Sequence, residues 1–366
     1  MVIKSISLQN YRNYRTLSLD FDPDTNIFYG DNAQGKTNIL EAVYVSGTSR
    51  SHRSSKDREL ICFSEEEAHI CTVFEKKGIL HKIDMHLRKN KTKGIAIDGV
   101  PIRKASELFG LIHFVFFSPE DLSIIKNGPA ERRHFLDSEL CQLDKVYLYQ
   151  LSNYNKVVLQ RNKLLKELYL HPDYREVLDV LDMQLVQYGS ALIQRRQTFA
   201  ELGEIVHRIH SQLSGGQEEM ELKYEPNVTV DAFAQMLFAN RERDMRLKTT
   251  ATGPHRDDIS FVVNGVDIRK FGSQGQQRTA ALSLKLSEIE LVKRLIGDTP
   301  VLLLDDVLSE LDSGRQNYLL NSIENIQTLI TCTGLDEFVN HRFSINRIYK
   351  VTDGSVTVEN KQEADR

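Results

Sequence analysis

The residues best suited to chemistry begin with 30–37, which reads Gly-Asp-Asn-Ala-Gln-Gly-Lys-Thr. The segment fills every fixed position of G-x-x-x-x-G-K-[ST], a loop whose backbone N–H groups surround a β-phosphate. The apolar stretch 25–29 before it predicts a buried strand, and 37–44 after it has the apolar spacing of a helix. Strand, glycine-rich turn and helix start are the context of a nucleotide-binding P-loop. The predicted binding residues are Gly30, Asp31, Asn32, Ala33, Gln34, Gly35, Lys36, Thr37 and Asn38.

Two carboxylates close an apolar run later in the chain. Residues 301–304 read Val-Leu-Leu-Leu, typical of a parallel strand covered on both faces, and Asp305 and Asp306 follow at once. In a P-loop ATPase the first acid holds the Mg²⁺ shell and the next polarises the attacking water, while the loop lysine reaches the β- and γ-phosphates. A solvated aspartate pair is the alternative, which a P-loop in the same chain disfavours. The predicted catalytic residues are Lys36, Asp305 and Asp306, and the predicted ligands of Mg²⁺ are Thr37 and Asp305.

A third ATPase element, a loop spelling Ser-x-Gly-Gln before a helix, has two candidates. Residues 213–217 (Leu-Ser-Gly-Gly-Gln) match the letters fully, but they stand where a long helix ends and an alternating stretch, 218–224, begins. There Ser-Gly-Gly is best explained as a helix C-cap. Residues 272–277 (Gly-Ser-Gln-Gly-Gln-Gln) match less well, but they precede a helix predicted over 274–295, whose first N–H groups could face a phosphate. We predict this second loop as the signature, with Ser273, Gly275 and Gln276 binding nucleotide.

The spacing of these elements predicts a dimer. Residues 309–312 (Ser-Glu-Leu-Asp) follow the acidic strand at the position of a D-loop, which meets a partner subunit across the nucleotide. A P-loop and a signature loop lie on separate faces of one head, so they cannot both grip one ATP. Two heads must therefore meet face to face, as an isologous homodimer that ATP holds together.

Composition places this chemistry in a soluble protein of more than one domain. The chain has 366 residues, of which 40% are hydrophobic and 27% charged. It lacks both a run of about 18 apolar residues and a signal-like N-terminus, so we expect a cytoplasmic protein with no membrane partner. The formal net charge of −4 argues against wholesale coating of nucleic acid, but it permits a local basic face. The four cysteines lack the spacing of a zinc site, and we expect neither zinc nor disulfides.

Two regions alternate like strands, 6–21 before the P-loop and 68–101 after it. The second reads as an antiparallel sheet, and the tip of one of its hairpins, 88–93, carries four cations. Such a tip is normally solvated, and contact with DNA is the alternative. Asn264-Gly265 signals a further hairpin with a type I′ turn.

The middle of the chain reads as helical. Apolar residues keep a 3/4 spacing over 136–168 and again over 178–213, interrupted only by Arg161 and Arg195. This predicts two helices of roughly 40 residues, each some 60 Å long. A turn at His171-Pro172 would join them as an αα-hairpin. An intermolecular coiled coil is the competing interpretation, which the short connection disfavours.

Taken together, these segments resemble the RecF-type members of the SMC-like ABC ATPases, from end to end of the chain. The resemblance implies an α/β fold, with an ABC/SMC-type ATPase head built on a mixed sheet around the P-loop and a mainly helical second lobe with a long αα-hairpin. The expected divisions are 1–117 and 273–366 for the head and 118–272 for the helical lobe. The segments that carry the resemblance are 9–14, 30–37, 51–53, 117–121, 132–137, 253–258, 272–278 and 304–312.

The resemblance also implies a function. It implies ATP and Mg²⁺ as cofactors, ATP-dependent dimers on duplex DNA and at junctions of single and double strands, and loading of recombinase together with RecO and RecR. Arg12 and Asn13 would contact nucleotide phosphates. Three departures from the wider ABC pattern imply slow hydrolysis: 117–121 replaces the glutamine loop, 331–334 lacks the switch histidine, and Asp306 replaces a glutamate.

Two other functions stay open at this point. The nucleotide-binding subunit of a membrane transporter would need a coupling surface for membrane helices, of which the sequence gives no clear sign. An SMC-type scaffold that does not itself touch DNA would show no salt-dependent DNA binding.

Overall fold

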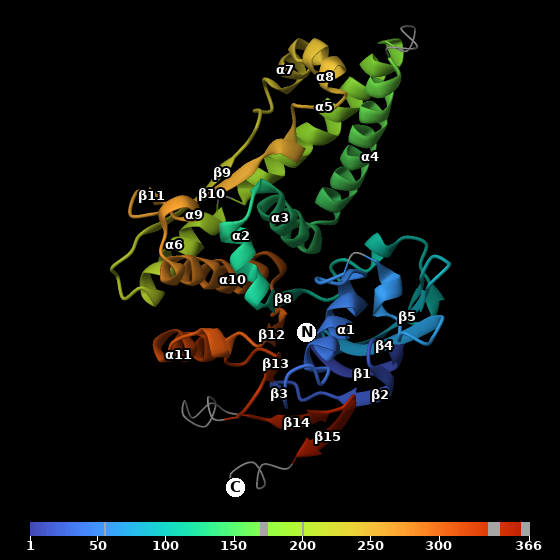
Figure 1. Cartoon of the computed structure of the whole chain (residues 1–366), viewed down its shortest axis with the longest axis vertical. Helices are drawn as coiled ribbons and strands as arrows, with labels where there is room; N and C mark the ends of the chain where they lie inside the picture. The colour runs from blue at the N-terminus through green and yellow to red at the C-terminus, as the bar shows by residue number, and fades with distance from the viewer. Residues whose placement is uncertain (55, 169–174, 200, 336–344, 360–366) are drawn as a thin grey trace. The chain divides into compact units, whose positions relative to one another are not determined.

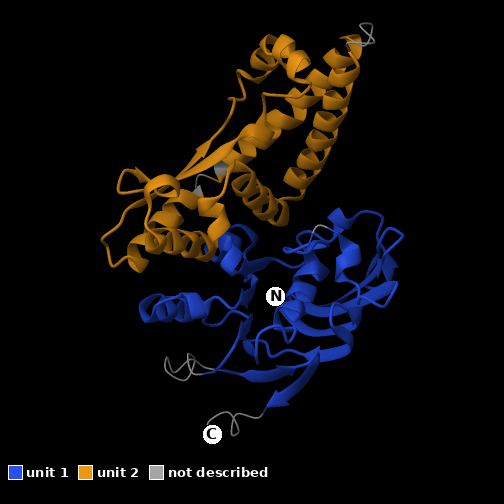
Figure 2. Cartoon of the chain, in the orientation of Figure 1, with its two compact units in different colours: residues 1–121, 288–366 blue, residues 122–287 orange. Residues whose placement is uncertain are grey.

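The computed structural model describes residues 1–54, 56–168, 175–199, 201–335 and 345–359. Two compact units divide the chain: unit 1 comprises 1–121 and 288–366, and unit 2 comprises 122–287 (Figure 2). The second boundary falls 15 residues beyond the predicted one at 272/273, inside a single continuous helix, α10 (Gln274–Ile296). The N-terminal half of α10 belongs to unit 2 because its side chains bond there, as Ser283 does with His210. The predicted signature loop is therefore part of the helical unit.

Unit 1 contains an antiparallel sheet of six strands in the order β2-β1-β4-β5-β6-β7. The long strand β4 buries alternate residues, as a sheet with one covered face requires. The strands predicted over 6–21 and 68–101 are thereby confirmed. They are β1 (Val2–Tyr11), β2 (Tyr14–Asp20), β4 (Glu67–Lys76), β5 (Ile79–Arg88), β6 (Gly94–Ile97) and β7 (Val100–Pro101).

A second, mixed sheet of unit 1 has the order β15-β14-β3-β13-β12-β8 (Figure 1). From β14 to β8 neighbouring strands run parallel, and β15 pairs with β14 antiparallel. Every residue of β12 and β13 is buried, as expected for parallel strands covered on both faces. These strands are β3 (Thr25–Tyr29), β8 (Phe114–Phe117), β12 (Val301–Asp305), β13 (Thr328–Cys332), β14 (Arg347–Thr352) and β15 (Ser355–Glu359).

Helix α1 (Lys36–Thr48) joins the two sheets of unit 1. It packs against β1, β4 and β5 of the antiparallel sheet and against β12 and β13 of the mixed sheet. Its apolar side chains, such as Leu40 and Val43, belong to the same buried cluster as Phe74 and Leu303. The helix that follows the P-loop is therefore fixed from both sides.

Unit 2 is mainly helical, but the two helices of roughly 40 residues are wrong as predicted, because each is interrupted. Asp144 is extended (φ −139°, ψ 106°), and its carboxylate accepts from the N–H groups of Val146 and Tyr147, so it ends one helix and caps the next. Helices α4 and α5 do pack on each other as the predicted αα-hairpin, whose turn at His171-Pro172 lies outside the described residues. The four helices are α3 (Pro129–Leu143), α4 (Lys145–Glu167), α5 (Arg175–Thr198) and α6 (Glu201–Leu213).

Of the two arginines that interrupt the apolar patterns, Arg161 is buried, whereas Arg195 is 39% exposed and pairs with Asp144; the neighbouring Arg196 is buried. Arg161 is fully buried and bonds to Asp182 on α5 and to Asp244, each at 2.6 Å. Arg196 bonds in the same way to Asp137 at 2.6 Å and to Asp257 at 2.7 Å. Buried charges of this kind need close partners, so these arginines join helices inside unit 2 rather than forming a solvated stripe.

Unit 2 also contains a small sheet with the order β11-β10-β9. The predicted hairpin at Asn264-Gly265 is confirmed, since both residues have the positive φ of a type I′ turn (48° and 80°). Within the described part of the chain, no helix is long and apolar enough to cross a membrane. The remaining elements of unit 2 are α2 (Leu122–Lys126), β9 (Met220–Glu225), α7 (Phe233–Ala239), α8 (Arg241–Leu247), β10 (Asp258–Val263), β11 (Val266–Asp267) and α9 (Ile268–Phe271).

Candidate nucleotide site

The predicted P-loop connects β3 to α1 in unit 1. Gly35 has a φ of +114°, and a Cβ atom there would lie 2.4 Å from the side-chain nitrogen of Asn13. At Gly30, with a φ of +148°, it would lie 2.3 Å from the carbonyl oxygen of Val351. Both the backbone conformation and the close neighbours therefore require glycine at these two positions.

Lys36 lies across the loop that precedes it. Its ammonium donates to the carbonyl oxygens of Gly30 at 2.6 Å and Asp31 at 2.7 Å. Burial lowers the pKa of Lys36, while the nearby carboxylates of Asp305 and Asp306 act in the opposite direction. An ammonium has three donors, so the Lys36 side chain can keep both loop contacts and still reach an anion.

Thr37, in the first turn of α1, meets Asp305, at the C-terminal end of β12. The Thr37 hydroxyl donates to Oδ1 of Asp305 at 2.7 Å, and the Thr331 hydroxyl donates to the same oxygen at 2.7 Å. The register explains this meeting, because Asp305 on β12 lies opposite Thr331 on β13, which in turn pairs with Phe28 of β3. A carboxylate beside a hydroxyl gives the hard oxygen donors that Mg²⁺ prefers, so Thr37 and Asp305 fit the predicted metal site.

Asp306 follows in the left-handed conformation, with a φ of +53°. Its N–H group donates to the Thr331 hydroxyl at 3.0 Å, and its carbonyl accepts from the Ser309 hydroxyl at 2.9 Å. Further along, Asp312 caps α11 (Ser313–Ser322) by accepting from the N–H of Arg315. The predicted D-loop is thus held at both ends by its own side chains.

A buried carboxylate, Glu41 on α1, was missed by the sequence analysis. Its side chain is fully buried, and Arg12 donates to both of its oxygens, at 2.7 Å and 2.8 Å. Arg53, Ser51 and Tyr11 also donate to it, at 3.0 Å, 2.6 Å and 3.1 Å. Burial by itself raises the pKa of Glu41, but the hydrogen bonds from Arg12, Arg53 and Ser51 outweigh it and lower the pKa to about 2. Glu41 is therefore an anion that holds two arginines beside the P-loop.

Asn13, in the turn between β1 and β2, contacts the P-loop directly. Its amide nitrogen donates to the carbonyl of Gln34 at 3.1 Å, and its amide oxygen accepts from Asn38 at 2.8 Å. The turn between β14 and β15 approaches the same place, where the N–H groups of Asp353 and Gly354 donate to Gln34. Two turns from separate sheets thus support the loop, although only Asn13 was anticipated from the sequence.

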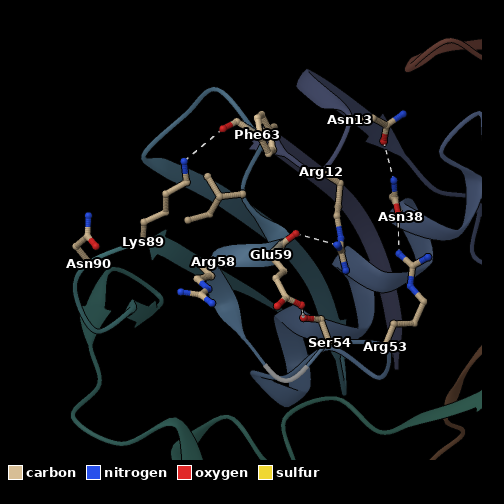
Figure 3. A pocket seen from close by; sticks show the side chains of 11 residues that line it. Arg12, Asn13, Asn38, Arg53, Ser54, Arg58, Glu59, Phe63, Lys89 and Asn90 are labelled. Atoms are coloured by element: carbon tan, nitrogen blue, oxygen red, sulfur yellow. Dashed lines mark hydrogen bonds between the residues drawn. The ribbon is translucent and has the colours of Figure 1, made fainter.

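A cavity of about 1020 Å³ opens beside this part of the loop, as Figure 3 shows. Asn13 and Asn38 belong both to its wall and to the surroundings of the loop, and the Phe63 side chain on its rim is fully exposed. The hairpin tip is less free than its sequence suggests, because Lys89 pairs with Glu66 at 3.4 Å. The lining residues are Arg12, Asn13, Asn38, Arg53, Ser54, Arg58, Glu59, Ile61, Phe63, Lys89 and Asn90.

The predicted signature loop precedes α10 in unit 2. Ser273 and Gln276 form a reciprocal capping box: the Gln276 N–H donates to the Ser273 hydroxyl at 3.2 Å, and the Ser273 N–H donates to the Gln276 amide oxygen at 2.9 Å. The competing segment, 213–217, is a helix C-cap, since Gly215 and Gly216 have positive φ and the Gly216 N–H returns to the carbonyl of Ser211 at 2.7 Å. The local geometry thus favours 272–277 as the loop at a helix start.

The architecture of unit 1 defines a class of protein, the ATPase head of SMC type. The family model described as the RecF/RecN/SMC N terminal domain matches residues 2–357. An SMC head bound to the C-winged helix domain of ScpA shares this fold with a TM-score of 0.59 at 14% identity, over 100% of this chain and 99% of that one.

Closer similarities identify the branch of that family. The chain is 62% identical over 359 residues to the DNA replication and repair protein RecF of Agathobacter rectalis, covering 98% of this chain and 99% of the relative. It is 59% identical over 363 residues to the protein of the same name from Lachnospira eligens, covering 98% and 100%. A solved structure of the recombination mediator protein RecF-ATP in the RecFOR pathway matches with a TM-score of 0.91 at 35% identity, covering 98% of both chains. The chain therefore belongs to the RecF family.

Proposed function

We propose that this chain is an ATP-gated DNA-binding protein of recombinational repair. In this proposal ATP brings two copies together, the dimer binds duplex DNA at junctions with single strands, and RecO and RecR cooperate with it to load recombinase in the cytoplasm. The observation that carries the nucleotide part is the meeting of Thr37 with Asp305 beside the P-loop lysine. The relatives named above support the repair part, one of them as a RecF-ATP structure in the RecFOR pathway.

Different residues of unit 1 would bind the phosphates, the Mg²⁺ ion and the nucleoside. The loop N–H groups and Lys36 would hold the phosphates, and Thr37 and Asp305 would hold Mg²⁺, which supplies charge neutralisation when it is bound. The cavity beside Asn13 and Asn38 is large enough for a nucleoside, and Arg12 would face the phosphates from its wall. Asp306 would orient the attacking water, with a side chain one methylene shorter than the glutamate of other ABC enzymes.

Hydrolysis is expected to be slow, so that the dimer acts as a timed clamp. Residues 331–334 stand where ABC enzymes carry a switch histidine and contain no histidine, and the hydroxyl of the first of them, Thr331, is engaged with Asp305. A threonine has no basic nitrogen that could take up or deliver a proton near neutral pH. Catalysis by proton transfer would therefore fall to Asp306 alone.

The decisive experiment measures molecular mass by light scattering with ATP, with ADP and without nucleotide, each with and without duplex DNA. ATP should double the mass and ADP should not. Ser273→Arg should keep ATP binding but abolish dimers, because a bulky cation would block the partner's nucleotide. Ser214→Arg, in the helix C-cap, is the matched control and should dimerise normally. A mass that still doubles in Ser273→Arg would refute the signature, and if only Ser214→Arg blocks dimers, the signature is 213–217.

Binding of DNA is tested separately. Affinity for a gapped duplex should rise with ATP and fall steeply with salt, because phosphate contacts release counterions. ATP-dependent dimers that bind no DNA at low salt would point instead to an SMC-type scaffold.

A further inference from the structure

The turn that follows α6 is a helix C-cap. Its last residue, Glu218, is half-buried and reaches beyond the turn to α10. One oxygen of Glu218, Oε1, accepts from the Gln276 side-chain amide at 2.9 Å. Gln276 is the residue that closes the capping box of the predicted signature loop. The residue that directly follows the segment 213–217 thus contacts the loop that we assign as the signature.

The other oxygen of Glu218 is held by a buried histidine. Nε2 of His210, a fully buried residue of α6, lies 3.0 Å from Oε2 of Glu218. On the opposite side of the ring, Nδ1 of His210 lies 3.2 Å from the hydroxyl of Ser283, whose own proton goes to the carbonyl of Thr279 at 2.7 Å. The imidazole of His210 thus lies between the Glu218 carboxylate and the Ser283 hydroxyl, and it bonds to both.

These contacts hold one face of α10 through two of its residues. Gln276 and Ser283 are seven residues apart, two helical turns, so their side chains point the same way. Gln276 bonds to Glu218 and Ser283 bonds to His210. Glu218 and His210 both come from α6 or the segment directly after it. The Glu218 carboxylate consequently has little freedom to leave Gln276.

The orientation of the Gln276 amide decides what Ser273 presents. A carboxylate only accepts hydrogen bonds, so Glu218 selects the NH₂ end of the amide and turns its oxygen toward the N–H of Ser273. The Ser273 hydroxyl then accepts from the Gln276 N–H. Among the described residues no acceptor takes the proton of this exposed hydroxyl, which leaves it for a phosphate oxygen.

We propose that Glu218 is a positioning residue of the signature loop. It fixes the Gln276 amide, and through it Ser273, in the geometry that meets the γ-phosphate on the P-loop of a second copy. This inference rests on the proposed ATP-dependent dimer. It requires that removal of Glu218 weakens dimerisation without weakening the binding of ATP to one chain.

The first test compares Glu218→Ala, Glu218→Gln and a neighbouring control, Glu219→Ala, whose side chain is exposed. Titration of monomer into dimer with ATP, by analytical ultracentrifugation, should show about tenfold weaker association for Glu218→Ala, as expected for the loss of one charge-assisted bond. Glutamine keeps an oxygen that can accept from Gln276, so Glu218→Gln should recover most of the association. Monomeric ATP affinity should be equal in all variants. Equal dimerisation of Glu218→Ala and Glu219→Ala overturns the proposal.

A second measurement does not depend on dimers. Amide hydrogen exchange over 273–277 in the nucleotide-free protein should be faster in Glu218→Ala, because Gln276 of the capping box loses its bond to Glu218. It should be unchanged in Glu219→Ala. In a Gln276→Ala background, Glu218→Ala should have almost no further effect on dimerisation. Unchanged exchange, or fully additive effects, overturns the role of Glu218. If the wild type does not dimerise with ATP, the proposed function fails, while the exchange result still decides whether Glu218 braces the loop.

Discussion

Replacement of Glu41 by glutamine should destabilise unit 1 and weaken nucleotide binding at once. Glu41 is fully buried, and its two oxygens receive hydrogen bonds from Arg12, Arg53, Ser51 and Tyr11. Glutamine has nearly the same shape, but it offers one acceptor in place of two and no charge. The two arginines would therefore lose the anion that holds them at the wall of the cavity.

The pKa of Glu41 sets the size of the effect. Its pKa falls from 4.5 to about 2 on folding, and at about 1.4 kcal/mol per pKa unit this corresponds to about 3 kcal/mol for the charged form. Because the pKa is lower in the folded state, this stabilisation is fully present above pH 4.5 and is lost as the pH falls through 2. Removal of one partner from a buried pair typically costs about 3–5 kcal/mol. Arg12 and Arg53 are 22% and 31% exposed and can turn partly to water, so we expect about 3 kcal/mol, near the lower end.

Urea unfolding of the wild type and of Glu41→Gln between pH 7 and pH 3 measures this difference. It should be about 3 kcal/mol at pH 7 and less than half of that at pH 3, since the wild-type carboxylate is then closer to its folded pKa. ATP affinity should fall about tenfold. Glu59→Gln is the matched control, because Glu59 is exposed on the same cavity wall and Arg12 bonds only to its backbone carbonyl. A loss below about 1 kcal/mol that does not vary with pH would refute the assigned role.

Three further predictions concern single side chains near the P-loop. Lys36→Met should reduce ATP affinity at least tenfold by calorimetry, and ATP-stimulated DNA binding by this variant would contradict the proposed order of events. Asp305→Asn should weaken Mg²⁺-ATP binding, whereas Asp306→Asn should preserve it. Asp306→Asn should also keep the left-handed turn, which asparagine tolerates, and slow single-turnover hydrolysis at least 10²-fold. A change of only a few-fold in hydrolysis would exclude Asp306 from catalysis. Burial lowers the pKa of His52 from 6.5 to about 4, so the wild type should lose about 3 kcal/mol of unfolding free energy as the pH falls from 6.5 to 4. His52→Phe should flatten that slope, because the ring lies against Phe116 and neither of its nitrogens has a hydrogen-bond partner among the described residues.

The parts of the fold that could be predicted from the sequence are those with local signals. The P-loop carries its glycines and lysine within eight residues, and the apolar run before Asp305 has the length and neighbours of a buried parallel strand. The hairpin at Asn264-Gly265 follows from the backbone preferences of two adjacent residues. None of these predictions requires knowledge of what packs against the segment.

The continuity of the long helices could not be predicted in the same way. Helices α3 and α4 both bury an apolar face, so a 3/4 spacing runs across the break as if one helix continued. The available signal was Asp144 itself, since aspartate followed by a fresh helical stretch is typical of an N-cap. The apolar residues on both sides of Asp144 indicate one continuous helix more strongly than this single polar residue indicates a break.

Glu41 was missed because its partners come from two separate parts of the chain, residues 11–12 and 51–53. It stands in the apolar run Ile39-Leu40-Glu41-Ala42-Val43, and a lone carboxylate there is the signal that could have revealed a buried anion. The arginines that neutralise it lie 29 residues before and 12 residues after it. Which cations reach it depends on how the β1–β2 turn and the loop after α1 pack on the helix.

Thr331 shows most clearly how a site residue is determined by strand register. In the sequence the segment 331–334 is notable only for lacking the histidine of other ABC enzymes. In the sheet, β13 lies between the P-loop strand β3 and the acidic strand β12. A residue near the C-terminal end of β13 therefore lies beside both the P-loop and the aspartate pair. The hydroxyl at that position fixes Asp305 by its side chain and receives the N–H of Asp306. A histidine at this end of the strand could exchange a proton with the site near neutral pH, whereas the Thr331 hydroxyl only holds the two aspartates in place. The lack of a histidine in the segment 331–334 is therefore a physical reason to expect slow hydrolysis.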